Sequence, residues 1–132
     1  MKRVLIADDE PIERMIVSRT VEKYFSEELT VVSAANGREA VEQFFAGDCQ
    51  IALLDIEMPG MNGLEAAEQI RKRDKNCSII FLTAFDEFNY AKRAIAVRAM
   101  EYLLKPVEDQ ELVAVLEEAV RIAEEQETDR EA

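Results

Sequence analysis

Four short runs of apolar residues divide the chain, and none of them alternates with polar residues. They cover residues 4–7, 51–54, 78–82 and 102–104. Continuous apolar character indicates strands that are buried on both faces, as in a parallel sheet covered by helices. A fifth segment, residues 30–34, is more polar, which favours a strand at the edge of that sheet.

Helical spacing of apolar residues follows each of these runs. Pro11 suits the first position of one helix, and Asn36, Asn62, Asp86 and Asp109 suit the caps of four more. Glutamates at the third position after both asparagines are typical of capping boxes. We expect these apolar faces: Val17, Thr20, Val21 and Tyr24; Ala40, Val41, Phe44 and Phe45; Leu64, Ala67 and Ile70; Phe88, Ala91 and Ile95; Leu112, Val115, Leu116, Ala119 and Ala123.

Five alternations of strand and helix predict right-handed crossovers and a doubly wound α/β domain. The fold class expected is a five-stranded parallel sheet in the order 2-1-3-4-5 inside a three-layer sandwich, because the weak second strand belongs at an edge. This domain occupies residues 1–123. Residues 124–132 lack an apolar anchor, so they are expected to form an acidic frayed tail or the start of a linker.

Composition excludes several functions. The 132 residues allow one domain, and the net charge of −12 opposes direct binding to nucleic acid or to an anionic membrane. The absence of histidine removes Ser-His-Asp hydrolysis and histidine zinc sites. The first apolar run ends at Asp8, too early for a secretory or membrane-spanning segment, so a cytoplasmic protein with reduced Cys49 and Cys77 is expected.

Polar residues follow the predicted strands at one edge of the sheet. Asp8 and Asp9 follow the first strand, Asp55 the third, Thr83 the fourth and Lys105 the fifth. The carboxyl ends of parallel strands form the ligand-binding edge, at the point where the strand order reverses. Three converging carboxylates repel one another, and an all-oxygen set favours a hard divalent cation such as Mg²⁺.

The same edge carries groups suited to phosphate. A lysine supplies a mobile positive charge, and the Thr83 hydroxyl supplies a short hydrogen-bond donor. Asp55 lies at the centre of the sheet, so it is the preferred nucleophile for an acyl phosphate. Taken singly, each group has a structural explanation as well: Asp8 and Asp9 as helix-capping acids, Thr83 as an ordinary strand residue, and Lys105 as a solvated strand end.

Four motifs resemble those of response-regulator receiver domains. They are VLIADDE at 4–10, LLDIEMPGMNG at 53–63, LTA at 82–84 and YLLKP at 102–106. The resemblance implies a flavodoxin-like fold, with phosphoryl transfer from a sensor histidine kinase to Asp55. It also implies Mg²⁺ held by Asp8, Asp9, Asp55 and the backbone carbonyl of Glu57. Thr83 and Tyr102 match the family's switch pair, and Lys105 with Pro106 matches the family's lysine that is followed by a cis peptide bond.

Residues 83–94 and 102–107 look most like receivers joined to AraC-type DNA-binding domains. Any DNA contact would then come from a C-terminal output domain outside this chain, because the chain contains no basic recognition helix. A phosphorylation-dependent homodimer through the fourth helix, fifth strand and fifth helix is a further hypothesis. Tyr102 could equally be an ordinary half-buried aromatic residue.

Two rival functions remain open at this point. One is a small Mg²⁺-dependent phosphatase or phosphotransferase acting through Asp55, which would turn over a phosphate ester many times. The other is an interaction module without phosphoryl chemistry, which the complete set of polar residues disfavours. Dinucleotide and nucleotide binding are disfavoured, because neither GxGxxG nor GxxxxGK[ST] occurs.

Overall fold

Five parallel strands form the central sheet in the order β2-β1-β3-β4-β5. The computed structural model describes residues 1–131, with side chains described for residues 1–128. The strands are β1 (Lys2–Ala7), β2 (Leu29–Ala34), β3 (Ile51–Leu54), β4 (Ser78–Thr83) and β5 (Glu101–Leu104). The helices are α1 (Pro11–Phe25), α2 (Gly37–Ala46), α3 (Gly63–Arg73), α4 (Phe88–Ala96) and α5 (Asp109–Glu131). The predicted fold class and strand order are confirmed.

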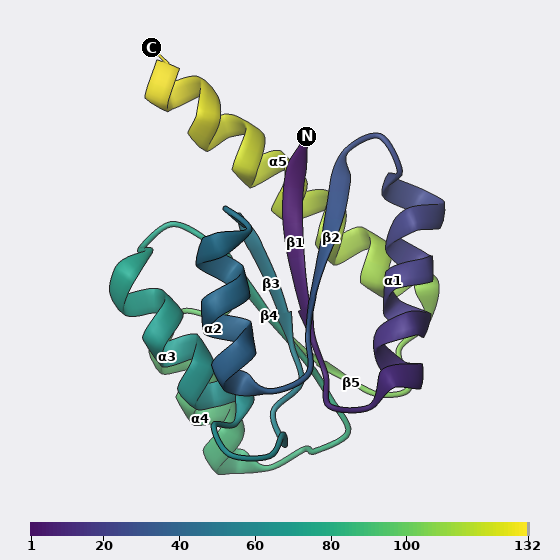
Figure 1. Ribbon diagram of the computed structural model, residues 1–132, viewed down its shortest axis with the longest axis vertical. Helices are drawn as coiled ribbons and strands as arrows, with labels where there is room; N and C mark the ends of the chain where they lie inside the picture. Colours follow the sequence, from purple (N-terminus) through teal and green to yellow (C-terminus); the bar gives the residue numbers. More distant parts are fainter. Residues whose placement is uncertain (132) are drawn as a thin grey trace.

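Helices cover both faces of the sheet, so the domain has three layers (Figure 1). On one face, α1 and α5 pack over Val4, Ile6 and the apolar residues of the same orientation in β3 and β4. On the other face, α2, α3 and α4 pack over Leu5, Ala7 and their counterparts. Every residue of β3 and β4 is buried, because successive side chains of a strand point to opposite faces and both faces are covered.

Helix starts follow the predicted capping residues in three cases. Pro11 is the first residue of α1. Asn62 and Glu65 form a capping box at α3, and Asn36 accepts a hydrogen bond from the N–H three residues later at α2. The prediction of Asp86 as a cap is wrong, because α4 begins after Glu87 and has no side-chain cap bond.

The predicted inner faces of α1 and α4 need correction. Tyr24 is 44% exposed, and its neighbour Phe25 is buried instead. On α4, Phe88 and Ile95 are 81% and 78% exposed, whereas Ala94 is buried. Ala94 is the buried residue of α4, and Tyr90 is partly buried against the same core, whereas Phe88 and Ile95 face outward.

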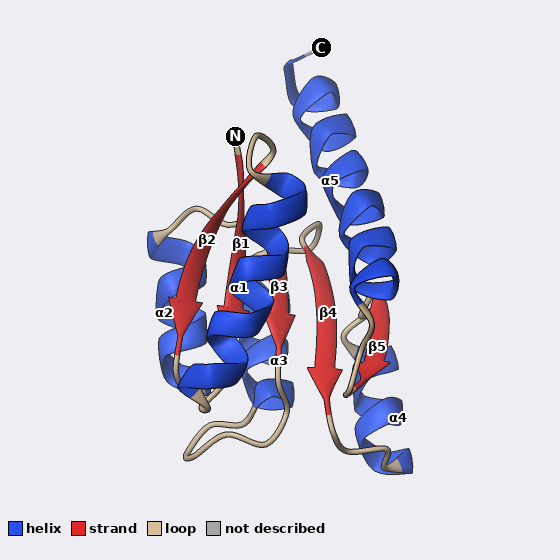
Figure 2. Cartoon of the chain, turned by 90° about the vertical axis from the view of Figure 1, so that its right-hand side faces the viewer, coloured by secondary structure: helices blue, strands red, loops and turns tan. Residues whose placement is uncertain are grey.

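The last helix runs further than the sequence predicts. It continues to Glu131, past the last predicted apolar position at Ala123. The expectation of a frayed tail over residues 124–132 stays a prediction. Polar contacts replace the missing apolar anchor: Gln126 Nε2 donates to the Asn76 carbonyl at 2.9 Å, and Lys2 pairs with Glu127. Figure 2 shows this end of α5 projecting past the sheet. A linker function for residues 124–132 stays a prediction.

The two cysteines do not form a disulfide bond. Cys49 and Cys77 are free and buried, and burial raises the pKa of each thiol to about 11, so both remain protonated at neutral pH.

Among the described residues, none of the helices has the length and apolar character needed to span a membrane.

Candidate functional site

Backbone hydrogen bonds hold the polar residues at the carboxyl edge of the sheet. The Asp8 N–H donates to the last carbonyl of β2 at 3.1 Å, and the Asp55 N–H donates to the last carbonyl of β1 at 2.9 Å. The Lys105 N–H donates to the last carbonyl of β4 at 2.8 Å. Each residue therefore extends the pairing of its strand by one step, which fixes the start of its side chain relative to the sheet.

Three carboxylates meet at this edge. Asp8, Asp9 and Asp55 each offer an oxygen, and these oxygens lie within 4.8 Å of one another. Asp8 and Asp55 are only 5% and 8% exposed, and Asp9 is more exposed than either. Carboxylates so close repel strongly in a partly buried setting. The cluster thus has the all-oxygen donor set that Mg²⁺ prefers, and it needs positive charge.

Lys105 supplies positive charge from the end of β5. Its Nζ lies 2.8 Å from Asp8 Oδ2 and 3.5 Å from Asp55 Oδ2. Glu13 of α1 lies at 3.8 Å, a neighbour that sequence reasoning missed because helical residues do not follow the strand-end rule. Burial alone lowers the pKa of Lys105, but the hydrogen bond to Asp8 and the nearby carboxylates outweigh it and raise the pKa overall. Lys105 is therefore a permanent cation at neutral pH.

Asp55 is held by its own loop as well as by Lys105. Its Oδ1 accepts the Ile56 N–H at 2.7 Å. Burial raises the pKa of Asp55, Lys105 opposes that shift, and the charge of Asp8 adds to it. Thr83 is fully buried at the end of β4, and its hydroxyl oxygen accepts the Phe85 N–H at 3.4 Å.

Tyr102 and Glu57 lie around this centre with defined partners. The Tyr102 ring is half-buried, and its hydroxyl donates to the Phe85 carbonyl in the loop after β4. Glu57 is exposed, and its carboxylate accepts a hydrogen bond from the Tyr90 hydroxyl of α4 at 3.3 Å. The peptide bond between Lys105 and Pro106 is cis, as the resemblance implied.

Gly63 shapes the loop that carries Asp55, a role that sequence reasoning did not assign. Its N–H donates to the Ile56 carbonyl at 2.7 Å. A Cβ at this position would lie 1.8 Å from the Asp55 carbonyl oxygen, so only glycine lets α3 begin here. The signal available in the sequence was a glycine directly after the Asn62 cap.

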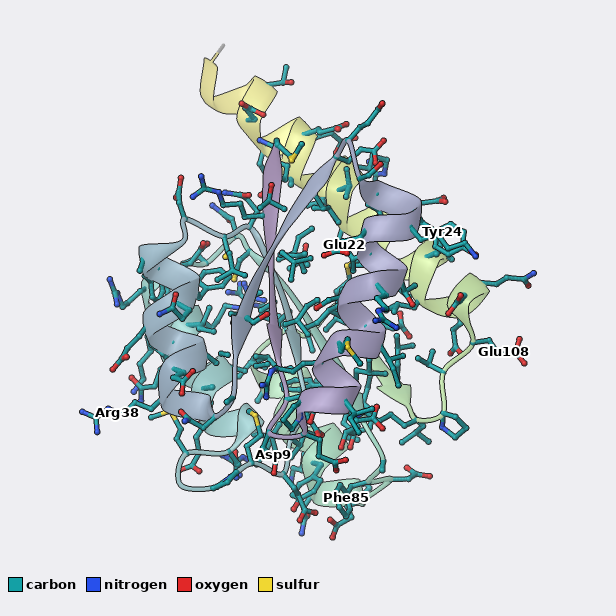
Figure 3. The ribbon with its side chains drawn as sticks, turned by 45° about the vertical axis from the view of Figure 1, so that its right-hand side comes forward. Asp9, Glu22, Tyr24, Arg38, Phe85 and Glu108 are labelled. Carbon is teal, nitrogen blue, oxygen red and sulfur yellow. The ribbon has the colours of Figure 1, made fainter. Side chains whose placement is uncertain are left out.

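A cavity of about 670 Å³ opens beside the cluster. Its lining includes Asp9, Asp55, Glu57 and Lys105, together with the apolar side chain of Phe85. Figure 3 shows Asp9 and Phe85 at the same end of the molecule. The cavity gives a phosphate-sized group access to a buried carboxylate that a lysine faces.

Comparisons with known proteins agree on one family. A model described as the response regulator receiver domain matches residues 4–117. The chain is 41% identical over 118 residues to the positive alginate biosynthesis regulatory protein of Pseudomonas aeruginosa, covering 89% of this chain and 47% of that protein. It is 36% identical over 115 residues to the chemotaxis protein CheY of Thermotoga maritima, covering 87% of this chain and 94% of CheY.

A solved structure gives the same result. The response regulator protein TrrA from Thermotoga maritima, in complex with Mg²⁺ and BeF, matches with a TM-score of 0.78 at 39% identity, covering 90% of this chain and 99% of that one. The chain spans less than half the length of the alginate regulator.

Proposed function

Because the chain belongs to the response regulator receiver domain family of two-component signalling, we propose that it accepts a phosphoryl group on Asp55 from a sensor histidine kinase. The observation that carries this proposal is the position of Asp55. It is a buried carboxylate at the edge of a central strand, with Lys105 Nζ 3.5 Å away and two other carboxylates beside it.

Mg²⁺ is the cofactor that this donor set fits. Asp8, Asp9 and Asp55 would hold the ion. The family resemblance adds the backbone carbonyl of Glu57 as a further ligand. When bound, the ion would neutralise charge on the transferring phosphoryl group. Strand pairing fixes the backbone of Asp8 and Asp55, so their carboxylates lie near each other before a cation binds.

The transfer itself needs a positioned nucleophile and charge compensation. An Asp55 carboxylate oxygen attacks the phosphorus of a phosphohistidine on the kinase. The new P–O bond forms as the P–N bond breaks, and the electron pair goes to the imidazole nitrogen, which takes a proton. Lys105 offsets the charge of the phosphoryl oxygens, and the Thr83 hydroxyl donates a hydrogen bond to one of them.

The switch acts through Phe85, whose backbone carries both switch contacts. In the present structure Thr83 accepts the Phe85 N–H and Tyr102 donates to the Phe85 carbonyl. A phosphoryl group on Asp55 would draw the Thr83 hydroxyl toward it, which releases the loop and lets Tyr102 turn inward. The change then reaches α4 and β5. In the cytoplasm, it would control an output domain, with transcription as the proposed target by similarity to the alginate regulator.

Intact-mass measurement tests the phosphoacceptor. After incubation with Mg²⁺ and a small acyl-phosphate donor, we expect one labile phosphate adduct on the wild-type chain. Asp55→Asn and a chelator should each abolish it, whereas Asp48→Asn, at the opposite end of the sheet, should leave it unchanged. An adduct that persists in Asp55→Asn contradicts the assignment. Many turnovers of a phosphate ester would instead support a phosphatase.

Homodimerisation of the phosphorylated form is a separate part of the proposal. Phe88 and Ile95 of α4 are exposed, and Leu104 of β5 is 40% exposed, which gives this side an apolar surface. Sedimentation of a stably phosphorylated sample should therefore show a dimer. A monomer at all concentrations would contradict this part while leaving the phosphoacceptor assignment intact.

A further inference from the structure

Tyr90 forms a contact that the phosphoryl chemistry does not use. Its hydroxyl, on the first turn of α4, donates to Glu57 Oε2 at 3.3 Å. Glu57 lies two residues after Asp55, in the loop between β3 and α3. The bond therefore joins the acceptor loop, residues 55–62, to the helix that follows the switch loop, residues 84–87.

Packing holds the Tyr90 ring and the backbone on either side of Glu57. The Tyr90 ring is partly buried against the core under α2, α3 and α4. In the loop, Ile56 and Met58 are buried on either side of Glu57, which leaves the Glu57 side chain exposed between them. A movement of the loop backbone at Glu57 therefore moves its carboxylate relative to the Tyr90 hydroxyl.

The Tyr90 hydroxyl also faces a second carboxylate. Glu87, the residue before α4, is a second carboxylate that acts on this hydroxyl and raises the pKa of Tyr90. Partial burial and these two carboxylates raise the pKa of Tyr90, so the phenol remains a donor at neutral pH. A phenol has one proton to donate, so it can serve only one of the two carboxylates at a time. Glu57 belongs to the acceptor loop and Glu87 to the switch loop.

We propose that Tyr90 is a positioning residue that reports the state of the acceptor loop to α4 through its hydrogen bond to Glu57. This inference rests on the proposed phosphorylation of Asp55. When the acceptor loop adjusts to a cation and a phosphoryl group, the Glu57 carboxylate moves, and the hydroxyl either follows it or turns to Glu87. Either response changes the first turn of α4, independently of the route through Thr83 and Tyr102.

Hydrogen exchange measured by mass spectrometry tests the inference on the full chain. The probe is Mg²⁺ with beryllium fluoride, which mimics a phosphoryl group on a carboxylate. In the wild type, we expect the probe to change exchange in residues 55–62 and in residues 88–96. In Tyr90→Phe, the change in residues 55–62 should persist, whereas the change in residues 88–96 should fall by about fivefold, the scale of one lost hydrogen bond.

Two further variants separate coupling from a general structural effect. Tyr24→Phe removes a hydroxyl on α1, far from Asp9 and Phe85 (Figure 3), and should respond like the wild type. Glu57→Gln should weaken the α4 response, and combining it with Tyr90→Phe should add nothing, because both act on one bond.

The outcomes are distinct. A Tyr90→Phe protein whose α4 response equals that of the wild type, or a double variant with additive losses, overturns the inference while phosphorylation of Asp55 stands. If the wild type takes up no phosphate on Asp55, the proposed function fails, and this inference fails with it.

Discussion

At the scale of single residues, the charge balance of the site depends on Lys105. Among the described ion pairs, it is the only cation paired with Asp8 or Asp55. In the absence of a metal ion, its ammonium group partly offsets the repulsion among the carboxylates. Lys105 and a cation therefore compete for Asp8, although both favour a bound phosphoryl group.

Lys105→Met tests this competition. We expect Mg²⁺ binding, followed by calorimetry, to be as tight as in the wild type or tighter, because Asp8 loses its competing partner. The phosphate adduct should form at least about tenfold more slowly, because one charge on the phosphoryl group is no longer compensated. Once formed, it should not move the Tyr102 region. Lys75→Met, an exposed lysine outside the site, is the control. A marked loss of Mg²⁺ affinity would show that the lysine organises the carboxylates instead.

The sequence predicted the residues at strand ends and missed those that reach the site from helices. Asp8, Asp55 and Lys105 could be placed together because parallel strands end at one edge, which needs no knowledge of side-chain direction. Glu13 and Tyr90 depend on how α1 and α4 are rotated over the sheet. That rotation is set by packing, which periodicity alone does not determine.

At the scale of elements, the junction between β3 and α3 depends on two glycines with different roles. Gly60 has a positive φ of 71°, and a Cβ added there would meet no atom within 4 Å. Gly63 has no room for a Cβ because the Asp55 carbonyl lies against it. One glycine provides backbone conformation, and the other provides close approach.

Substitution by alanine should separate these roles. Gly60→Ala should cost about 1 kcal/mol in the free energy of unfolding, the strain of a left-handed residue. Gly63→Ala should cost roughly 3 kcal/mol or more, because backbone atoms cannot yield as a side chain does. Urea denaturation measures both values. Equal losses would mean that α3 can shift away from the acceptor loop without penalty.

The elements differ in how well their patterns predicted them. Continuous apolar runs identified β1, β3 and β4, because burial on both faces leaves little room for polar residues. The outward Phe88 and Ile95 of α4 could not be predicted, because an apolar residue on a helix can face the core or a partner equally well. The last turns of α5 were missed because their contacts with Lys2 and Asn76 are long-range and polar.

At the scale of the whole molecule, the apolar core ends before the last helix does. Ala119, Val120 and Ala123 are the last buried apolar residues in the part of α5 whose side chains are described. Beyond them, the described contacts of α5 with the domain are polar: the pair between Lys2 and Glu127 and the bond from Gln126 to Asn76. Apolar burial thus holds α5 on the domain as far as Ala123, and polar contacts hold its last turns.

Two truncations test whether the folding unit ends near residue 123. A chain that stops after residue 123 loses only partly exposed polar contacts, so its free energy of unfolding should fall by about 1 kcal/mol. A chain that stops after residue 118 also loses Ala119, Val120 and Ala123, and it should lose roughly 3 kcal/mol or more, because buried apolar area is removed. Urea denaturation with phosphate uptake on Asp55 as a second readout compares them. The chain that stops after residue 123 could prove as unstable as the chain that stops after residue 118. In that case the polar contacts of the projecting helix stabilise the domain, and residues 124–131 belong to the folding unit.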